Sequence, residues 1–503
     1  MDRLSHIKQR MCYNDDMHPD ETQIDFSKIP FAKDLCPCGY YPQNECTQIF
    51  NMTHWFKEPD FCIDGKDFPI KQYYSFLKKN GFCRYNSLFY RYECTKCRQC
   101  TPVRIPVNQF KASKNQRAAW NKNQDIDVTL EKNPEKFVSE EKALLLREYD
   151  AYHNESQEGY VKKTLDEAQA TLKEMNSGYD GIWNLEYRLN GRLIGVSVLD
   201  FTENSEGKID SFCSNYFYYE ISDEIEKRSI GVFSVLKELE LCRELNVPYY
   251  YLGLFLSGCR KMNYKINYEP YELLIDGVWL SSDIKFPAPG EIYEDYPEVC
   301  FVTKEIELPV LIAAYKNGIF PWFCEEAGEP VVWQSTDPRF VIPIQELHIP
   351  KTLKKFLKHT PYTYTMDKCF EQVMKECRMM DRVGQSGTWI GPKMLAAYSE
   401  LHKMGYAHSF EVWHDEKLVG GFYGVLLGSV FCGESMFTKE SNSSSSAFIL
   451  FAQAFAECGG KLIDCQAYTD NMARYGAQEI PRTQYLKLLK KYQKIRLLKE
   501  LKL

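Results

Sequence analysis

The chain has 503 residues, of which 44 % are hydrophobic and 26 % charged, so it is not a disordered or fibrous protein. This length is sufficient for about three globular domains. No segment approaches the roughly 18 uncharged apolar residues that a membrane helix needs, and residues 1–12 lack the apolar core of a secretory signal. We therefore expect a cytoplasmic protein with no membrane partner.

The net charge of −7 disfavours a nucleic-acid partner, but the basic residues are concentrated in two stretches. Residues 84–122 contain nine Lys or Arg and one Glu, and residues 482–503 contain eight Lys or Arg and one Glu. Such a local excess can bind a polyanion, because affinity follows the number of phosphates that are neutralised. The alternative is that both stretches are solvated helix faces.

The first half opens with a region rich in Cys and aromatic residues, 1–130, which contains a short helix over 68–80. A chain with 19 cysteines and no export signal is expected to hold free thiols rather than disulfides. Three cysteines of this region recur at intervals of three, and with an upstream cysteine they could bind zinc or an iron–sulfur cluster. That set is Cys38, Cys94, Cys97 and Cys100. Free thiols in a basic turn are the alternative.

Residues 131–285 carry the patterns of a mixed α/β domain. Two alternating stretches, 182–189 and 192–201, are joined by Asn190-Gly191, which is the strongest short-range signal for a β-hairpin. The other elements predicted here are helices over 134–153, 160–176 and 230–245, and a strand over 249–255.

Prolines and acidic residues at 286–298 predict a linker, after which the same order of elements returns in residues 299–503. The expected helices are 307–317, 349–358, 392–404 and 446–458, followed by a strand at 461–466. The serine run at 441–446 predicts a loop before the fourth helix. The fold class is therefore α/β (α+β), with two tandem mixed-sheet halves built on one plan.

A series of motifs in the second half occurs in the order typical of one enzyme family. They are FPWF (320–323), TDPRF (336–340), GTWI (387–390), GYAHSFEVW (405–413), LVGGFYGV (418–425), FCGESMF (431–437) and KLIDCQ (461–466). Over residues 300–490 the chain resembles the leucyl/phenylalanyl-tRNA–protein transferases.

The first half resembles a second family over residues 31–280. The motifs are FYRYECTKCRQCTPVRIPVNQFKASKNQR (89–117), RSIGVFSVL (228–236) and YLGLFLSGCRKMNYK (251–265). They are similar to those of the arginyl-tRNA–protein transferases and of the leucyl transferases that act on Asp and Glu. Both resemblances imply an acetyltransferase-like (GNAT-like) fold.

The resemblances imply transfer of an amino acid from aminoacyl-tRNA to the N-terminus of a protein, which marks that protein for degradation. The second half would use Leu-tRNA or Phe-tRNA and proteins that start with Arg or Lys. The first half would use Leu-tRNA, or Arg-tRNA, and proteins that start with Asp or Glu. No cofactor is required, because the aminoacyl ester is already activated.

Three polar residues are the expected catalytic groups of the second half. In a strand over KLIDCQ, Asp464 and Gln466 would face the same side, about 7 Å apart, and could relay charge to the attacking amine. Glu434 lies on an adjacent predicted strand, and the resemblance places it near the aminoacyl-adenosine end of the tRNA. The alternative for Asp464 is a capping or pairing role at a strand end.

The resemblance also implies groups that hold the tRNA and the transferred amino acid. The residues near the tRNA 3′ end would be Trp322, Trp389, Tyr315 and Tyr398. The apolar aminoacyl pocket would be Met436, Phe422, Phe448, Phe451, Phe455 and Ile463, which also fit a plain hydrophobic core. Lysines at helical spacing, with apolar residues between them, could contact phosphates or form an ordinary solvated face: Lys351, Lys354, Lys355 and Lys358.

The chemistry of the first half is less apparent from the sequence, and we name no general base there. Bidentate arginine suits an acidic acceptor, and the candidates in the matched motif are Arg91, Arg104 and Arg117. Three residues of the last motif could line the tRNA end: Lys261, Tyr264 and Lys265.

Other functions remain open at this point. The first half could be a tRNA-binding module, with only the C-terminal half catalytic. An acetyl-CoA-dependent N-acetyltransferase would share the fold, but in the turn Arg228–Phe233 the last residue is Phe where close approach of a pyrophosphate needs a small residue. A transferase that uses a cell-wall amine is a further alternative.

Overall fold

The computed structural model describes residues 29, 31–40, 45–52, 69–155, 159–256, 259, 261–323, 328–380, 390–495, 497–499 and 501. They form two compact units: residues 284–503 together with 96–99 belong to the second, and the rest of the chain to the first. Within the described residues, no helix is both long enough and apolar enough to cross a membrane.

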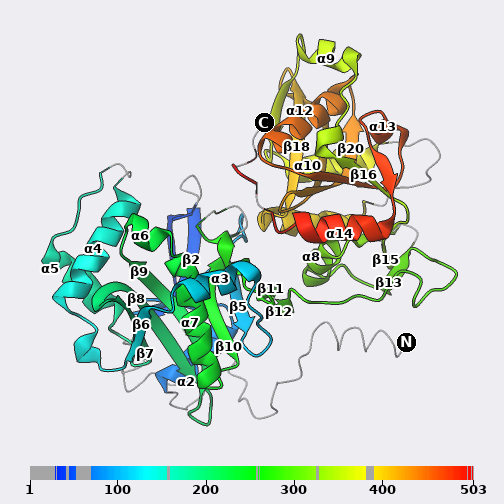
Figure 1. Ribbon diagram of the computed structural model, residues 1–503. Helices are drawn as coiled ribbons and strands as arrows, with labels where there is room; N and C mark the ends of the chain where they lie inside the picture. The colour runs from blue at the N-terminus through cyan, green and yellow to red at the C-terminus, as the bar shows by residue number, and fades with distance from the viewer. Residues whose placement is uncertain are drawn as a thin grey trace. The chain divides into compact units, whose positions relative to one another are not determined.

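The first unit contains an eight-stranded mixed sheet in the order β12-β11-β5-β10-β9-β8-β7-β6 (Figure 1). The predicted hairpin is confirmed, because β7 and β8 are antiparallel and Asn190 and Gly191 have φ of 51° and 81°. The strands are β5 (Thr101–Pro106), β6 (Ile126–Glu131), β7 (Ile182–Leu189), β8 (Arg192–Glu203), β9 (Ile209–Tyr219), β10 (Tyr249–Phe255), β11 (Glu272–Ile275) and β12 (Val278–Ser281).

Helices cover both faces of this sheet, which explains why β8 is almost wholly buried. On one face, β8 packs against α2 (Ile70–Lys79) and α4 (Glu140–Asn154), with α5 (Leu165–Met175) beside them. On the other face lies α7 (Ile230–Glu244), which is covered in turn by α3 (Lys114–Lys122) (Figure 1). The short α6 (Asp223–Glu226) precedes α7.

A smaller antiparallel sheet packs on the α2 side of the first unit, where Ile49 and Phe89 join the core. Its order is β1-β2-β4-β3. The strands are β1 (Ala32–Pro37), β2 (Glu45–Met52), β3 (Cys83–Tyr85) and β4 (Leu88–Tyr92).

The second unit has a seven-stranded mixed sheet in the order β17-β18-β19-β20-β21-β16-β22. Its strands are β16 (Arg339–Pro343), β17 (Thr363–Met366), β18 (Ala407–His414), β19 (Lys417–Leu427), β20 (Val430–Thr438), β21 (Leu462–Gln466) and β22 (Gln478–Ile480). A three-stranded sheet, which the sequence analysis did not predict, consists of β13 (Val299–Thr303), β15 (Val331–Gln334) and β14 (Phe320–Trp322).

The predicted helices of the second unit are present as α8 (Leu308–Lys316), α9 (Lys351–Leu357), α11 (Pro392–Lys403) and α12 (Ser443–Glu457). Unpredicted helices are α10 (Phe370–Met379) and α13 (Asp470–Ala473), whereas α14 (Arg482–Tyr492) lies in the basic stretch for which a helix face was one of the two interpretations. The strand β20 is followed by α12 and then by β21, as β9 is followed by α7 and then by β10. The prediction of two mixed-sheet α/β halves is confirmed.

The prediction of a serine loop at 441–446 is wrong in most of its length, because α12 begins at Ser443. The hydroxyl of Ser443 donates to the carbonyl of Val419 at 3.0 Å and is fully buried. A Cβ at Gly420 would lie 2.3 Å from the same hydroxyl oxygen. The serines therefore open the helix because only small side chains fit where it meets β19.

Candidate active site

The candidate site of the second unit lies where two parallel strands separate. Strands β20 and β21 pair through Val430–Leu462, Phe431–Ile463 and Cys432–Asp464 and then diverge. Just beyond this point the register of β20 against β19 shifts, which leaves Glu434 as the extra residue of a bulge. Gln466 lies at the corresponding position of β21, two residues after Asp464, and its φ of 63° is left-handed. The bulge and the turn in the backbone direct these two side chains toward one another.

Glu434 is the centre of a hydrogen-bonded cluster. One of its carboxylate oxygens accepts from the hydroxyl of Tyr315 at 2.6 Å and from Nε2 of Gln466 at 2.7 Å. The other accepts from the hydroxyl of Tyr398 at 3.3 Å, and the two tyrosine hydroxyls also contact each other. Burial raises the pKa of Glu434 to about 7, although the three donors oppose this shift. The cluster thus joins α8, α11, β20 and β21.

The raised pKa of Glu434 predicts a specific pH dependence of stability. The folded state binds more protons than the unfolded state between the ordinary pKa of 4.5 and about 7. The free energy of unfolding of the second unit should therefore fall as pH rises through this interval. Denaturant unfolding of the wild type and of Glu434→Gln at pH 4.5, 6 and 8 would measure it. The variant should show a smaller decline, and parallel curves for the two proteins would contradict the assignment.

Asp464 forms a buried ion pair with Arg339 and does not line the space where β20 and β21 separate. Its two oxygens accept from Nε and Nη2 of Arg339 at 2.8 and 2.6 Å, and both side chains are buried. The hydroxyl of Tyr485 adds a bond of 2.7 Å. The backbone N–H of Gln466 donates to Asp464 as well, at 2.9 Å. The carboxylate thereby holds the backbone that presents Gln466.

The expected alternation of Asp464 and Gln466 along one strand face does not describe this site. The left-handed φ of Gln466 ends the extended conformation, so its side chain reaches Glu434 while Asp464 reaches Arg339. Sequence reasoning missed Arg339 and Tyr485. A useful signal was present in TDPRF, since an arginine that opens a buried strand needs a buried partner.

The residues expected to form the aminoacyl pocket lie together. Phe422, Phe448, Phe451, Phe455 and Ile463 belong to one buried cluster, and Met436 packs against it while partly buried. The ring centres of Phe422 and Phe451 are 5.5 Å apart. The sulfur of Met436 also accepts from the side-chain amide of Asn471 at 3.0 Å.

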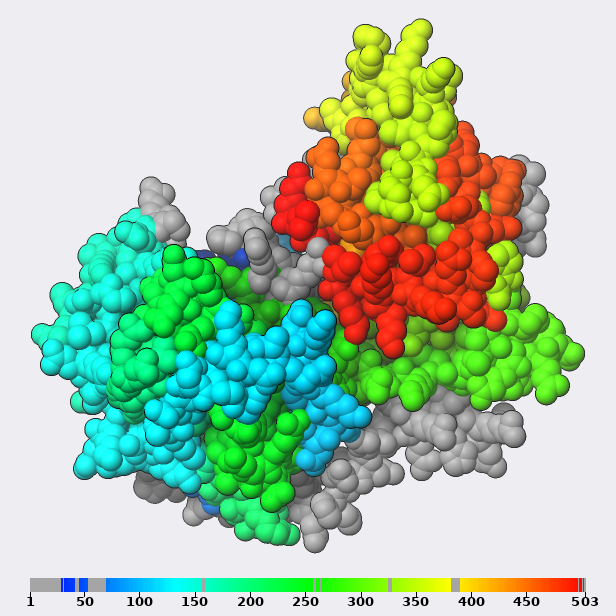
Figure 2. Space-filling model, viewed as in Figure 1, coloured from blue at the N-terminus to red at the C-terminus, as the bar shows by residue number. Residues whose placement is uncertain are grey.

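The expected tRNA contacts differ in their surroundings. Tyr315 and Tyr398 are buried in the Glu434 cluster, Trp322 at the end of β14 is 42 % exposed, and Trp389 lies outside the described residues. The amphipathic pattern of α9 is confirmed, because Leu353 is buried while all four lysines are exposed. In Figure 2 the yellow-green atoms of this segment project from the surface of the second unit. The lysines are Lys351, Lys354, Lys355 and Lys358.

The structure does not gather the three candidate arginines of the first unit. Arg104 is buried, donates to Glu272 at 2.7 Å, and has its guanidinium carbon 3.8 and 4.2 Å from the ring centres of Tyr249 and Trp279. Arg91 donates to Glu93 and to a backbone carbonyl. Arg117 is exposed and donates to the carbonyl of Ala112. Arg104 is therefore fully engaged inside the unit.

The last motif of the first half contributes one buried cation. Lys261 and Tyr264 are exposed, whereas Lys265 is 7 % exposed and its Nζ donates to the carbonyl of Leu254 at 2.8 Å. Burial lowers the pKa of Lys265 to about 8.

Several of the N-terminal thiols lie close to one another, since Cys36, Cys38 and Cys94 all act on the pKa of Cys46. Cys36 and Cys46 face each other on β1 and β2 with their sulfurs 3.1 Å apart. Across the part of the chain that the structure describes, no three or more Cys, His, Asp or Glu residues are placed to hold a metal ion. Binding of zinc or an iron–sulfur cluster by Cys38, Cys94, Cys97 and Cys100 stays a prediction, and no step of the chemistry below depends on it.

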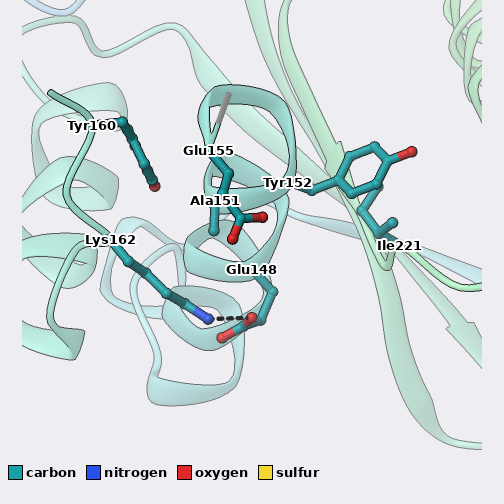
Figure 3. A pocket seen from close by; sticks show the side chains of 7 residues that line it. All are labelled: Glu148, Ala151, Tyr152, Glu155, Tyr160, Lys162 and Ile221. Carbon is teal, nitrogen blue, oxygen red and sulfur yellow. Dashed lines mark hydrogen bonds and ion pairs between the residues drawn. The ribbon is translucent and has the colours of Figure 1, made fainter. Parts of the chain in front are cut away.

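A cavity of about 410 Å³ lies elsewhere in the first unit, between α4 and the segment that leads to α5 (Figure 3). The side chain of Lys162 lines this cavity, and its Nζ donates to Oε2 of Glu148 at 2.7 Å. It is lined by Glu148, Ala151, Tyr152, Glu155, Tyr160, Lys162 and Ile221, so none of the candidate site residues borders it.

Comparison with known proteins gives different family matches for the first and second halves of the chain. Family models described as leucyl/phenylalanyl-tRNA protein transferase and its N-terminal domain match residues 341–490 and 305–337. Those described as the N and C termini of arginine-tRNA-protein transferase match residues 36–118 and 141–275.

Two curated leucyl/phenylalanyl-tRNA–protein transferases illustrate the similarity. The chain is 45 % identical over 212 residues to that of Flavobacterium johnsoniae, covering 42 % of this chain and 98 % of the relative. It is 43 % identical over 212 residues to that of Teredinibacter turnerae, covering 42 % and 81 %.

Similar solved structures are more distant. One is L-PGS from Bacillus licheniformis, with a TM-score of 0.24, 12 % identity, and coverage of 36 % of this chain and 58 % of that one. Another is a ribosomal-protein-alanine N-acetyltransferase from Brucella melitensis biovar Abortus 2308, with a TM-score of 0.17, 11 % identity, and coverage of 24 % and 74 %.

The long matches to curated relatives decide the family. Both domains of the arginine-tRNA–protein transferases precede the matched region in this chain. The chain belongs to the leucyl/phenylalanyl-tRNA–protein transferases and is an aminoacyltransferase, which transfers an amino acid from aminoacyl-tRNA to protein N-termini.

Proposed function

We propose that one chain labels both basic and acidic protein N-termini. The second unit transfers Leu or Phe from its tRNA to proteins that start with Arg or Lys. The first unit transfers Leu, or Arg, to proteins that start with Asp or Glu. Both products would enter N-degron proteolysis in the cytoplasm. The observation that carries the proposal for the second unit is the Glu434–Gln466 pair, held where β20 and β21 separate.

The reaction in the second unit needs positioning and one proton acceptor. The α-amine attacks the ester carbonyl carbon, a C–N bond forms, and the C–O bond to the terminal ribose breaks. One amine proton must leave, and the ribose oxygen must gain one. Because Nε2 of Gln466 donates to Glu434, its amide oxygen is the atom that can accept a hydrogen bond from the amine. Positioning of this kind supplies about 7–11 kcal/mol of a barrier.

The same site suits a basic acceptor and an apolar donor. The carboxylate of Glu434 attracts the cation of an incoming Arg or Lys, while the phenylalanine cluster beside Met436 would receive the Leu or Phe side chain. The exposed lysines of α9 would contact tRNA phosphates. Trp322 offers an exposed ring on which a base can stack.

A transfer assay with four reporters tests the whole proposal. Leu-tRNA, Phe-tRNA and Arg-tRNA, each charged with labelled amino acid, are supplied with reporter proteins that start with Arg, Lys, Asp or Glu. We expect labelling of all four, with Phe restricted to the basic starts. Labelling of the basic starts alone would leave the first unit as a tRNA-binding module. Acetyl transfer from acetyl-CoA in place of aminoacyl transfer would overturn the proposal.

A further inference from the structure

The two units share the local geometry of the candidate site, although their residues differ. In the first unit, β9 and β10 are parallel and pair through Ser211–Tyr249, Phe212–Tyr250 and Cys213–Tyr251 before they diverge. The second unit has the corresponding three pairs between β20 and β21. The residue pair Cys213–Tyr251 therefore corresponds to Cys432–Asp464.

The correspondence continues to the residues beyond the last pair. A register shift of β9 against β8 leaves Asn215 as the extra residue, two positions after Cys213. Glu434 occupies the same place in the second unit, two positions after Cys432. On the neighbouring strand, Gly253 has a φ of 73° and follows Tyr251 by two, as left-handed Gln466 follows Asp464. The first unit thus holds an equivalent separation of strands.

Neither catalytic side chain of the second unit has a counterpart at these positions. Gly253 has no side chain. The side-chain amide of Asn215 binds Arg84: its oxygen accepts from Nη2 of Arg84 at 2.8 Å, and its nitrogen donates to the backbone carbonyl of Arg84 at 3.1 Å. A different group fills the space. A Cβ built on Gly253 would lie 3.7 Å from Nζ of Lys265. The amine of Lys265 thus stands where the Gln466 side chain begins in the second unit.

The surroundings of Lys265 allow its amine to lose a proton. The thiols of Cys83, Cys213 and Cys259 are the titratable groups that act on its pKa, and no carboxylate of the described residues forms an ion pair with it. Lys142 provides a contrast in the same unit, since it is also buried but pairs with Glu186 at 2.8 Å. Buried without a counter-charge, Lys265 has a pKa lowered to about 8, so a useful fraction is neutral near neutral pH.

We propose that Lys265 is the proton-accepting catalytic residue of a second transfer centre, located where β9 and β10 separate. The inference rests on the proposed activity of the first unit. The acceptor amine forms the C–N bond to the ester carbonyl as the C–O bond to the ribose breaks. Its proton passes to the neutral Nζ of Lys265, which then protonates the departing ribose oxygen. The first unit would thus perform the same reaction with the amine of Lys265 where the second unit has the amide of Gln466.

Lys265→Arg in the full chain is the decisive variant. Arginine keeps the cation and a donor for the Leu254 carbonyl but does not deprotonate. We expect labelling of Asp-starting reporters to fall by at least 100-fold, with the affinity for tRNA and the labelling of Arg-starting reporters unchanged. Lys142→Arg is the matched control for replacing a buried lysine and should retain both activities. Should Lys265→Arg fail to fold, Lys265→Met, which preserves the volume of the stem, replaces it.

The outcomes separate the inference from the function on which it rests. A folded Lys265 variant that labels Asp-starting reporters at the wild-type rate overturns the role of Lys265 but leaves the first unit an enzyme. Equal loss in Lys142→Arg overturns it too, because the effect then follows from repacking. A wild-type chain that labels no acidic start from Leu-tRNA or Arg-tRNA overturns the proposed function and this inference together.

Discussion

Labelling of Arg-starting reporters should fall by about 100- to 1,000-fold when Gln466 is replaced by alanine, the loss typical for one oriented polar group at a developing charge. The reason is that Gln466 is the residue of β21 that turns toward Glu434 and offers its amide oxygen to the amine. Single-turnover transfer from Leu-tRNA would measure the rate. Labelling of Asp-starting reporters in the same tube should stay at the wild-type level.

Gln478→Ala is the matched control for this loss. Gln478 lies on β22 of the same sheet, is exposed, and donates to Glu346 at 2.7 Å, away from the cluster. It should transfer at the wild-type rate. A rate for Gln466→Ala within threefold of wild type would remove Gln466 from the mechanism, and a parallel loss on acidic starts would mean that the units do not act independently.

Asp464→Asn should destabilise the second unit and abolish labelling of Arg-starting reporters. The substitution leaves the buried guanidinium of Arg339 without its counter-charge, which typically costs about 3–5 kcal/mol. For a domain of this size the midpoint of thermal unfolding should fall by roughly 10 °C. Labelling of Asp-starting reporters should persist, because the first unit is intact.

The double variant Arg339→Met/Asp464→Leu separates the contribution of the ion pair to stability from the contribution of Asp464 to transfer. Replacing a buried ion pair by apolar residues is often neutral for stability, so the unfolding midpoint should largely recover. Transfer should not recover, because the backbone N–H of Gln466 loses its acceptor at Asp464. An unchanged midpoint in Asp464→Asn would show that the pair contributes little to stability.

Patterns that depend on neighbours in the chain were predicted well. The Asn190-Gly191 hairpin and the buried face of α9 follow from turn preference and helical spacing, and both are present. The start of α12 was missed because a serine run is usually solvated, whereas here its small side chains are selected by contact with Gly420. That contact joins residues more than 20 positions apart and leaves no local pattern.

The candidate site was also predicted only where it depends on residues close together in the sequence or on adjacent strands. The nearness of Glu434 and Gln466 was expected from adjacent strands and is observed. The Arg339–Asp464 pair was not foreseen, because it joins residues 125 positions apart. The position of Lys265 became apparent only when the two strand separations were compared, since neither the left-handed φ of Gly253 nor the register shift at Asn215 can be read from residue types alone.

The left-handed backbone conformation at Gln466 means that stability and activity require different residues at this one position. A residue with a Cβ is strained by about 1–2 kcal/mol in this conformation, and the Thr336 hydroxyl, which donates to the Gln466 carbonyl at 2.8 Å, helps to hold it there. A glycine would adopt the same φ without strain, as Gly253 does in the first unit, but it would remove the amide. Selection for a more heat-resistant protein and selection for faster transfer would therefore favour opposite residues at this position.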